Sequence, residues 1–234
     1  MKLHWSPRSP FVRKVMIVLH ETALIDRVEC VRSVVAFMAA PNEDVLRDNP
    51  LGKIPALVLD DGRTLFDSRV ICEYLDGLEG SSALFPADPG ERVRQLRWMA
   101  LGDGLTEILL LWRNELLRPA GAYDVLTSAF ARKVRVCMER LDAEAPELGA
   151  APFGIGHIAI VCAVGQLDFR FRDSHWREAF PALAEWFGRV GRRDSIVATM
   201  PRDDPSLVPV PRGFDETSPI DFRSFPSAPP RNTT

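Results

Sequence analysis

Two dipeptides in the first 70 residues combine the residue types that begin helices and attract anions. Ser9-Pro10 places a hydroxyl at an N-cap and a proline at the first helical position. Asp67-Ser68 precedes an apolar helical run in the same way. A helix start exposes free backbone N–H groups and a partial positive charge. Both dipeptides therefore mark places where a negatively charged group can be held.

The cysteines and histidines form no metal-binding or redox motif. The chain has no CxxC pair and no HExxH, and its four histidines are scattered. We expect the cysteines to be buried thiols and the protein to hold no metal. The four cysteines are Cys30, Cys72, Cys137 and Cys162.

Hydrophobic periodicity predicts the elements that position the two dipeptides. A strand is predicted over 2–5 and a helix from residue 10, then a second strand near 27–32 and an irregular or helical stretch to residue 49. Residues 54–66 predict two strands joined by a tight turn at Asp61-Gly62, and Asp67 then caps a helix. The order is βαβ followed by ββα, with a parallel first pair and an antiparallel pair across the turn.

From about residue 88 onward only helical periodicity remains. We expect helices over 91–117, 123–145, 156–171 and 179–190. The breaks between them are predicted at Ala120-Gly121, Pro146 and Pro152. The chain then divides into an α/β domain over 1–80, a linker over 81–90, an all-helical domain over 91–200 and an extension over 201–234.

The extension is rich in proline, with eight of the 19 prolines of the chain. Such a segment cannot stay helical for long. It still carries apolar residues, so we expect it to lie extended over the body and to bury some of them. These candidate anchors are Leu207, Val208, Val210, Phe214, Ile220, Phe222 and Phe225.

The composition matches a soluble globular protein. The 234 residues are 46% hydrophobic and 26% charged, with a formal net charge of -3. This balance offers no basic surface to nucleic acid or anionic membranes, and no apolar run reaches the ~18 residues of a membrane span. The first residues have no apolar signal-peptide core. We expect a cytoplasmic protein that binds neither nucleic acid nor membrane.

Three motifs in a fixed order resemble the bacterial glutathione S-transferase family. They are SPFVRKV (9–15), NPLGKIPAL (49–57) and LFDSRVICEYL (65–75), and the resemblance continues through Gly102-Asp103-Gly104 and 158–165 to about residue 200. It implies a thioredoxin-like, glutathione-binding domain followed by an all-helical domain that completes a pocket for an electrophile. It also implies a role in detoxification.

Each motif offers a contact for glutathione, which is γ-Glu-Cys-Gly. The resemblance implies a cis Ile54-Pro55 bond, which leaves the Ile54 backbone free to pair with the cysteinyl backbone. The alternative is a trans proline that begins an edge strand. Asp67 and Ser68 would bind the γ-glutamyl end, or Asp67 would only cap the helix. Lys53 would pair with a ligand carboxylate, or would only be solvated.

Ser9 is the candidate catalytic residue. Its hydroxyl can accept a hydrogen bond from the helix while it donates one to the ligand sulfur. Together with the helix N-terminus, this would lower a thiol pKa from ~8.5 to about 7. The alternative is a cap and nothing more. Because position 9 is not cysteine, we expect conjugation or displacement and not disulfide reduction.

The predicted helical domain has three unusual features. Gly102 and Gly104 each cost a helix about 1 kcal/mol, which indicates a kink or a close approach. Asp103 between them would face glutathione of its own or a partner subunit, or would be structural. Residues 108–112 are apolar all round the helix, so we expect burial in the core and in a homodimer interface. Where many relatives have a capping pair, this chain has Gly154 and His157, which weakens that helix start.

The sequence therefore predicts a glutathione transferase. Glutathione held by Ile54, Asp67 and Ser68, with its thiolate stabilised by Ser9, would attack a small hydrophobic electrophile. Dehalogenation and ether cleavage remain possible outcomes of the same chemistry. The alternative is a catalytically silent member of the family that acts as an interaction or regulatory module.

Overall fold

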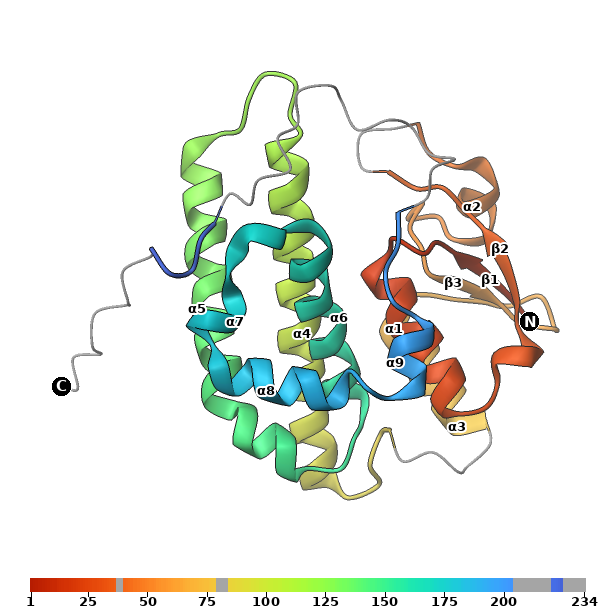
Figure 1. Ribbon diagram of the computed structural model, residues 1–234. Helices are drawn as coiled ribbons and strands as arrows, with labels where there is room; N and C mark the ends of the chain where they lie inside the picture. The colour runs from red at the N-terminus through yellow and green to blue at the C-terminus, as the bar shows by residue number, and fades with distance from the viewer. Residues whose placement is uncertain (37–39, 79–83, 204–219, 225–234) are drawn as a thin grey trace.

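The computed structural model describes residues 1–36, 40–78, 84–203 and 220–224 (Figure 1). The first two ranges hold a four-stranded sheet in the order β2-β1-β3-β4. β1 runs parallel to β2 and antiparallel to β3, and β3 is antiparallel to β4. The elements are β1 (Lys2–Trp5), α1 (Pro10–Glu21), a 3-10 turn (Ile25–Arg27), β2 (Glu29–Arg32), α2 (Glu43–Asp48), β3 (Ala56–Val58), β4 (Thr64–Leu65) and α3 (Ser68–Leu78).

The βαβ and ββα order predicted from the sequence is confirmed. Gly62 has φ +85 in the turn between β3 and β4, which is the conformation that glycine permits there. α1 packs on α3. Leu3 and Leu57 of the sheet are fully buried, as are Val15 of α1 and Ile71 of α3. The apolar stripes of both helices thus complete the first core.

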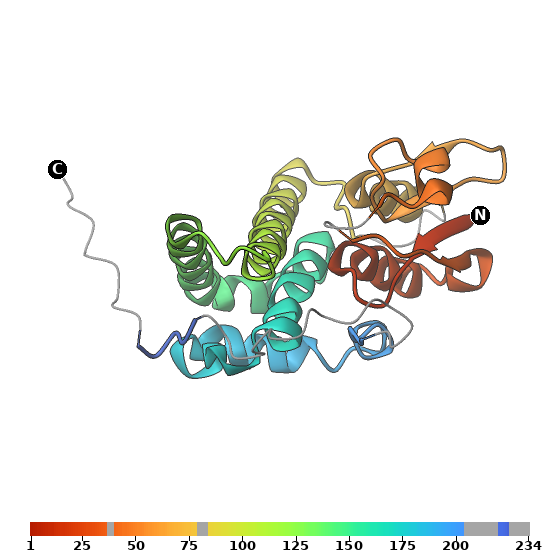
Figure 2. The same cartoon turned by 90° about the horizontal axis from the view of Figure 1, so that it is seen from above.

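The remaining elements of the described chain are all helical. They are α4 (Pro89–Leu116), α5 (Asp124–Ala150), α6 (Ile155–Arg170), a 3-10 turn (Arg172–Ser174), α7 (Trp176–Ala179), α8 (Pro181–Val190) and α9 (Asp194–Ala198). α6 packs against both α4 and α1, and every residue from Ile155 to Leu167 is buried. α9 returns to the first domain and lies beside α1 (Figures 1 and 2). α6 and α9 therefore join the two domains.

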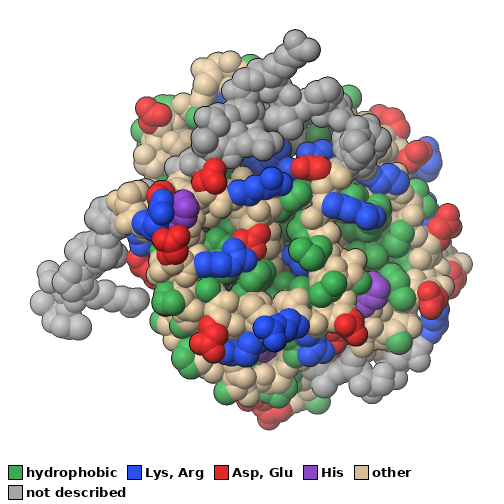
Figure 3. Space-filling model, viewed as in Figure 1, with side chains coloured by type: hydrophobic (Ala, Val, Ile, Leu, Met, Phe, Trp, Pro, Cys, Tyr) green, Lys and Arg blue, Asp and Glu red, His purple; other side chains and the backbone are tan. Residues whose placement is uncertain are grey.

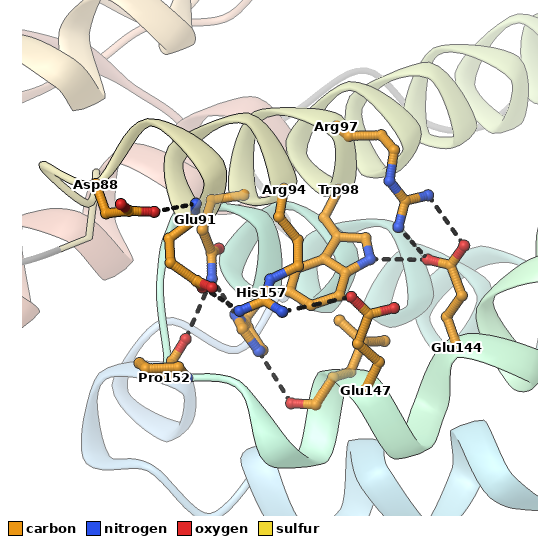
Figure 4. Close-up of polar contacts among 11 residues, drawn as sticks. Asp88, Glu91, Arg94, Arg97, Trp98, Glu144, Glu147, Pro152 and His157 are labelled. Atoms are coloured by element: carbon orange, nitrogen blue, oxygen red, sulfur yellow. Dashed lines mark hydrogen bonds and ion pairs between the residues drawn. The ribbon is translucent and has the colours of Figure 1, made fainter.

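Three predicted boundaries in the helical part are wrong. The helix expected to begin at residue 179 is α8, which begins at Pro181. α4 begins at Pro89, capped by Asp88, so it starts inside the predicted linker. α5 continues through Pro146 to Ala150 instead of ending there. Proline lacks the N–H that would bond to the carbonyl of Asp142, but the residues just before it are held by contacts with other helices. Asp142 Oδ1 accepts from the Leu183 amide at 2.8 Å. Glu144 Oε2 accepts from Trp98 Nε1 at 2.8 Å (Figure 4).

The start of α6 has a cap that comes from another helix. Gln95 Oε1 on α4 accepts from the Gly156 amide at 2.9 Å, and His157 Nδ1 accepts from the Gly154 amide at 3.2 Å. His157 Nε2 lies 3.0 Å from the Leu148 carbonyl, which can only accept, so Nε2 carries the hydrogen. Burial lowers the pKa of His157 to about 4. The predicted weakness of this helix start is thus offset by long-range contacts.

Gly102 is explained by close helix packing. A Cβ at this position would lie 2.5 Å from the Ala159 carbonyl carbon, so only glycine lets α4 approach α6 this closely. Gly104 has open space around it. The apolar run that follows is not buried all round in the protomer. Leu109 and Trp112 are buried, whereas Leu111 is 46% exposed.

Part of the extension returns to the helical domain. Ile220 and Phe222 are buried, the Phe222 amide donates to the Ser174 carbonyl at 2.9 Å, and its ring contacts Phe180 at 5.2 Å. Anchoring by these two residues is confirmed. The other predicted anchors lie outside the described residues.

The cysteines differ in exposure. Cys72 and Cys162 are buried and Cys137 is half-buried, but Cys30 is exposed, so the prediction of a buried thiol is wrong there. In the described ranges no three His, Cys, Asp or Glu side chains are grouped so as to hold a metal ion. None of the helices in these ranges is long and apolar enough to cross a membrane.

Candidate functional site

The strand register brings three separate segments to one edge of the sheet. His4 pairs with Ala56 across β1 and β3, and Leu57 pairs with Leu65 across β3 and β4. The carboxyl end of β1, the amino end of β3 and the carboxyl end of β4 therefore lie side by side. These ends lead directly to the predicted site residues, which are Ser9, Lys53, Ile54, Pro55, Asp67 and Ser68.

Ser9 is the N-cap of α1, as predicted. Its backbone is extended and its Oγ accepts from the Val12 amide at 3.2 Å, with Pro10 at the first helical position. The hydroxyl hydrogen has no acceptor among the described residues. Ser9 is half-buried, so this O–H is available to a ligand at the helix start.

The cis Ile54-Pro55 bond is confirmed. In the described part of the chain, neither the amide nor the carbonyl of Ile54 makes a backbone hydrogen bond. This segment can therefore pair with an extended peptide as an added strand would.

Asn49 shapes the loop before this segment and was not singled out from the sequence. Its buried side chain donates from Nδ2 to the Lys53 carbonyl at 2.8 Å and accepts at Oδ1 from the Leu51 amide at 3.1 Å. The signal for it was the turn chemistry of Asn-Pro-Leu-Gly. Asn49 thus positions Ile54, while the Lys53 side chain is exposed.

Asp67 and Ser68 form the start of α3. Asp67 is exposed and its Oδ1 accepts from the Arg69 amide at 2.9 Å, so it is a cap. Ser68 is buried, and its hydroxyl makes no hydrogen bond to any residue that the structure describes. A cap and an unpartnered hydroxyl thus stand together at a second helix N-terminus, which favours an anionic group.

Asp103 is a buried residue of α4 that is ion-paired with α1 and α3, the two helices whose starts form the candidate site. Its two carboxylate oxygens are each 2.8 Å from Lys14 Nζ, and Arg69 Nε is 2.8 Å from Oδ2. Asp103 and Lys14 are both buried. Both carboxylate oxygens are thus paired within the chain, so the geometry favours the structural alternative. The ion-paired triad of Lys14, Arg69 and Asp103 connects α1, α3 and α4 directly behind the site.

Comparison with known proteins identifies the family. The family models "Glutathione S-transferase, N-terminal domain" and "Glutathione S-transferase, C-terminal domain" match residues 8–78 and 120–189. The uncharacterized GST-like protein YibF of Escherichia coli is 32% identical over 205 residues, which cover 86% of this chain and 98% of that protein. This chain belongs to the glutathione S-transferase family. The resemblance and the fold class predicted from its three motifs are confirmed.

Solved structures of glutathione S-transferases have the same fold as this chain. A family member from Pseudomonas fluorescens Pf-5 with bound glutathione is 41% identical, with a TM-score of 0.82 over 86% of this chain and 99% of that one. A glutathione S-transferase from Methylobacillus flagellatus with glutathione bound is 34% identical, with a TM-score of 0.79 over 86% and 99%. The fold of this glutathione S-transferase family member is therefore one on which glutathione is held in its relatives.

Proposed function

We propose that this protein is an active glutathione transferase that joins the glutathione thiolate to an electrophile. The observation that carries the proposal is the free O–H of Ser9, at the start of α1, on the same edge of the sheet as the free backbone of Ile54 and the hydroxyl of Ser68. A structural neighbour from Pseudomonas fluorescens Pf-5, 40% identical, has S-(propanoic acid)-glutathione bound. That ligand supports a site with room for a group on the sulfur.

In this proposal the tripeptide lies along the sheet edge. The Ile54 amide and carbonyl pair with the cysteinyl backbone. Ser68 and the free N–H groups of α3 bind the γ-glutamyl carboxylate, and Asp67 faces its ammonium. Lys53, exposed beside Ile54, pairs with the glycine carboxylate. In this pose the cysteine sulfur would lie toward Ser9.

Ser9 then stabilises the thiolate. Its O–H donates to the sulfur, while Oγ keeps the bond from the Val12 amide. With an aryl chloride, the sulfur bonds to the ring carbon and chloride leaves with the electron pair of the broken bond. The thiol proton passes to solvent before the attack. The hydrogen bond and the helix N-terminus favour the charged form, so a larger share of bound glutathione is thiolate at neutral pH.

Calorimetry with glutathione, together with conjugation of 1-chloro-2,4-dinitrobenzene, tests the proposal. We expect saturable binding below millimolar glutathione and turnover of the aryl chloride. S-methylglutathione is the matched control, because it should bind but cannot react. Absence of binding at millimolar glutathione would contradict the site itself. Binding without turnover of any electrophile would favour the catalytically silent alternative.

We also propose that the transferase is a homodimer. Val70 on α3 and Val93 on α4 are both exposed, and the Arg92–Glu73 ion pair ties the outer faces of these two helices together. The two valines give a small apolar surface on helices that are joined by an ion pair. A second copy of the chain would cover them.

A further inference from the structure

Three arginines from three different elements converge beside Ser9. Arg8 lies in the loop before α1, Arg113 near the end of α4 and Arg170 at the end of α6. Arg8 Nε is 3.2 Å from Asp203 Oδ1, and Arg170 Nη1 is 3.0 Å from the same oxygen. We call Arg8, Arg113 and Arg170 the arginine cluster. It already holds one carboxylate of its own chain.

The positive charge of the cluster exceeds what Asp203 can neutralise. Arg8 and Arg170 pair with this one carboxylate, and Arg113 is near enough to interact electrostatically with Arg8, Arg170 and Asp203. The Arg113 guanidinium itself makes no ion pair or hydrogen bond with any residue that the structure describes. The Arg170 side chain is only 12% exposed. Burial, followed by repulsion from Arg113, lowers the pKa of Arg170 to about 10. Burial and repulsion from Arg8 also lower the pKa of Arg113. A further anion would relieve this repulsion.

The position of the cluster connects it with the chemistry at Ser9. Arg8 is the neighbour of Ser9 in the chain, and consecutive Cα atoms are about 3.8 Å apart. Arg113 and Arg170 belong to the helical domain, which in the proposed function completes the pocket for the electrophile. Figure 3 shows Lys and Arg side chains interspersed with Asp and Glu side chains in the upper middle of this face.

The carboxylate of Asp203 is held so that it can be displaced. The Asp203 side chain is 57% exposed, and its segment is pinned by the Arg202 amide, which donates to the Pro7 carbonyl at 3.3 Å. Only the carboxylate side of these ion pairs is exposed, so water competes for Asp203 and weakens its hold on the arginines. Asp203 therefore shows that a carboxylate fits the arginine cluster, and a carboxylate of a ligand can take its place.

We propose that the arginine cluster binds a carboxylate of the electrophile, so that this transferase selects anionic electrophiles, and that Asp203 occupies the site until the substrate displaces it. This inference rests on the proposed transferase function. Arginine suits the role because its planar fork binds a carboxylate through two hydrogen bonds. In an aryl chloride acid, the cluster holds the carboxylate while the glutathione sulfur bonds to the ring carbon and chloride leaves with the bonding pair.

A matched pair of substrates tests the proposal with the full chain. The probes are 4-chloro-3-nitrobenzoate and its methyl ester, which differ in the charge of one group. We expect a higher kcat/KM for the acid, despite the greater intrinsic reactivity of the ester, and a preference that falls as salt is added. Arg113→Gln should lower kcat/KM for the acid by roughly tenfold and change that for the ester by less than about twofold.

Two further variants sharpen the test. Asp203→Asn removes the competing carboxylate, so the KM for the acid should fall while the KM for the ester stays unchanged. Arg132→Gln, on the exposed side of α5, removes one positive charge elsewhere and should change neither substrate. Equal losses for acid and ester in Arg113→Gln would overturn the proposal. A rise in the KM for glutathione alone would assign the cluster to the glycine carboxylate of glutathione, and would also overturn it.

Binding of preformed conjugates separates this inference from the proposed function. If neither substrate turns over, the transferase proposal fails, and calorimetry of the acid conjugate against its methyl ester decides the anion site alone. Tighter binding of the acid conjugate, lost in Arg113→Gln, would support the cluster. Equal binding of both conjugates, or binding of neither, would overturn it.

Discussion

The Ser9 hydroxyl can accept one hydrogen bond and donate another at the same time. The oxygen accepts from the Val12 amide and so begins α1, while the hydrogen is left for a ligand. The same residue therefore contributes to stability and, in our proposal, to thiolate formation. The two contributions can be separated, because only the second depends on the bound sulfur.

Replacement of Ser9 by alanine should remove the thiolate contribution. A hydrogen bond to a charged group is worth about 1.5–3 kcal/mol, so Ser9→Ala should raise the pKa of bound glutathione by about one to two units. We expect kcat/KM at pH 7 to fall by roughly 10- to 100-fold, and the rise of the rate with pH to move to higher pH. Thiolate absorbance of the complex as a function of pH measures the shift.

Asp88→Ala is the matched control for this variant. Asp88 caps α4 through the Glu91 amide at 2.9 Å, away from the sheet edge. Both variants lose an N-cap, so both should lose about 1 kcal/mol of stability in urea unfolding. Only Ser9→Ala should change the thiol pKa. Wild-type kcat/KM in Ser9→Ala would leave Ser9 with its capping role alone.

At the scale of elements, α6 is the helix on which both domains rest, and its start depends on His157. The neutral imidazole accepts from the Gly154 amide and donates to the Leu148 carbonyl. Protonation would add a hydrogen to Nδ1 and break the first of these bonds. Burial disfavours the charged form as well, and holds the pKa of His157 near 4.

Stability should therefore depend on pH in a defined window. The folded pKa of His157, about 4, lies below the ordinary value of 6.5, so the unfolded chain binds this proton first as the pH falls. Its contribution is complete above about pH 6.5 and is lost progressively down to about pH 4. The loss amounts to roughly 3 kcal/mol at 1.36 kcal/mol per unit. Urea unfolding at pH values from 4.5 to 7 measures it.

His157→Gln provides the comparison. Its stability should change much less across this window, whatever its value at pH 7. Glu21 and Glu144 also have lowered pKa values, but their contributions are lost only as the pH falls below the ordinary value of 4.5. An equal slope in the wild type and in the variant above pH 4.5 would contradict the assignment to His157.

The elements that could be predicted from the sequence are those with local signals. Ser9-Pro10 marked the start of α1, and Asp61-Gly62 marked the hairpin, because a cap and a turn depend on adjacent residues. The predicted helix end at Pro146 was wrong because it relied on a local signal alone. The contacts that stabilise α5 around this proline come from α4 and α8, which are distant in the sequence. The Gln95 cap of α6 and the pairing of Asp103 with Lys14 join residues more than 60 positions apart, so no local pattern could show them.

At the scale of the whole molecule, ion pairs between the two domains support the candidate site. Lys14, Arg69 and Asp103 tie α1, α3 and α4 together, and burial makes this pairing costly to break. The site residues in front of it lie on loops and helix starts. In our proposal the first domain supplies the glutathione contacts, and the second fixes their relative positions and contributes Arg113 and Arg170 to the arginine cluster.

The proposed dimer predicts the effect of a charge on its apolar face. Val93→Arg should convert the dimer to a monomer, because an unpaired guanidinium would be buried against the partner subunit. Val197→Arg is the control, since this exposed valine belongs to α9, which packs against α1. Sedimentation velocity measures both. A dimer that persists in Val93→Arg would place the interface elsewhere, and a monomeric wild type would remove it.

The returning end of the chain acts as a strap on the helical domain. The Phe222 ring fills a buried position beside Phe180, and its carbonyl accepts from Arg135 Nη2 at 2.8 Å. Phe222→Ala should lower the free energy of unfolding by about 3 kcal/mol, whereas Arg223→Ala, an exposed neighbour, should change it by less than about 0.5 kcal/mol. Urea unfolding compares the two variants.

Truncation after Met200 distinguishes a strap from a functional tail. It removes Phe222 and should destabilise the protein about as much as Phe222→Ala, with unchanged glutathione affinity. It also removes Asp203, so the preference for the anionic aryl chloride should rise in the truncated chain but not in Phe222→Ala. Loss of the dimer on truncation would instead show that the tail bridges subunits. Unchanged stability would mean that burial of Phe222 contributes nothing to the folded domain.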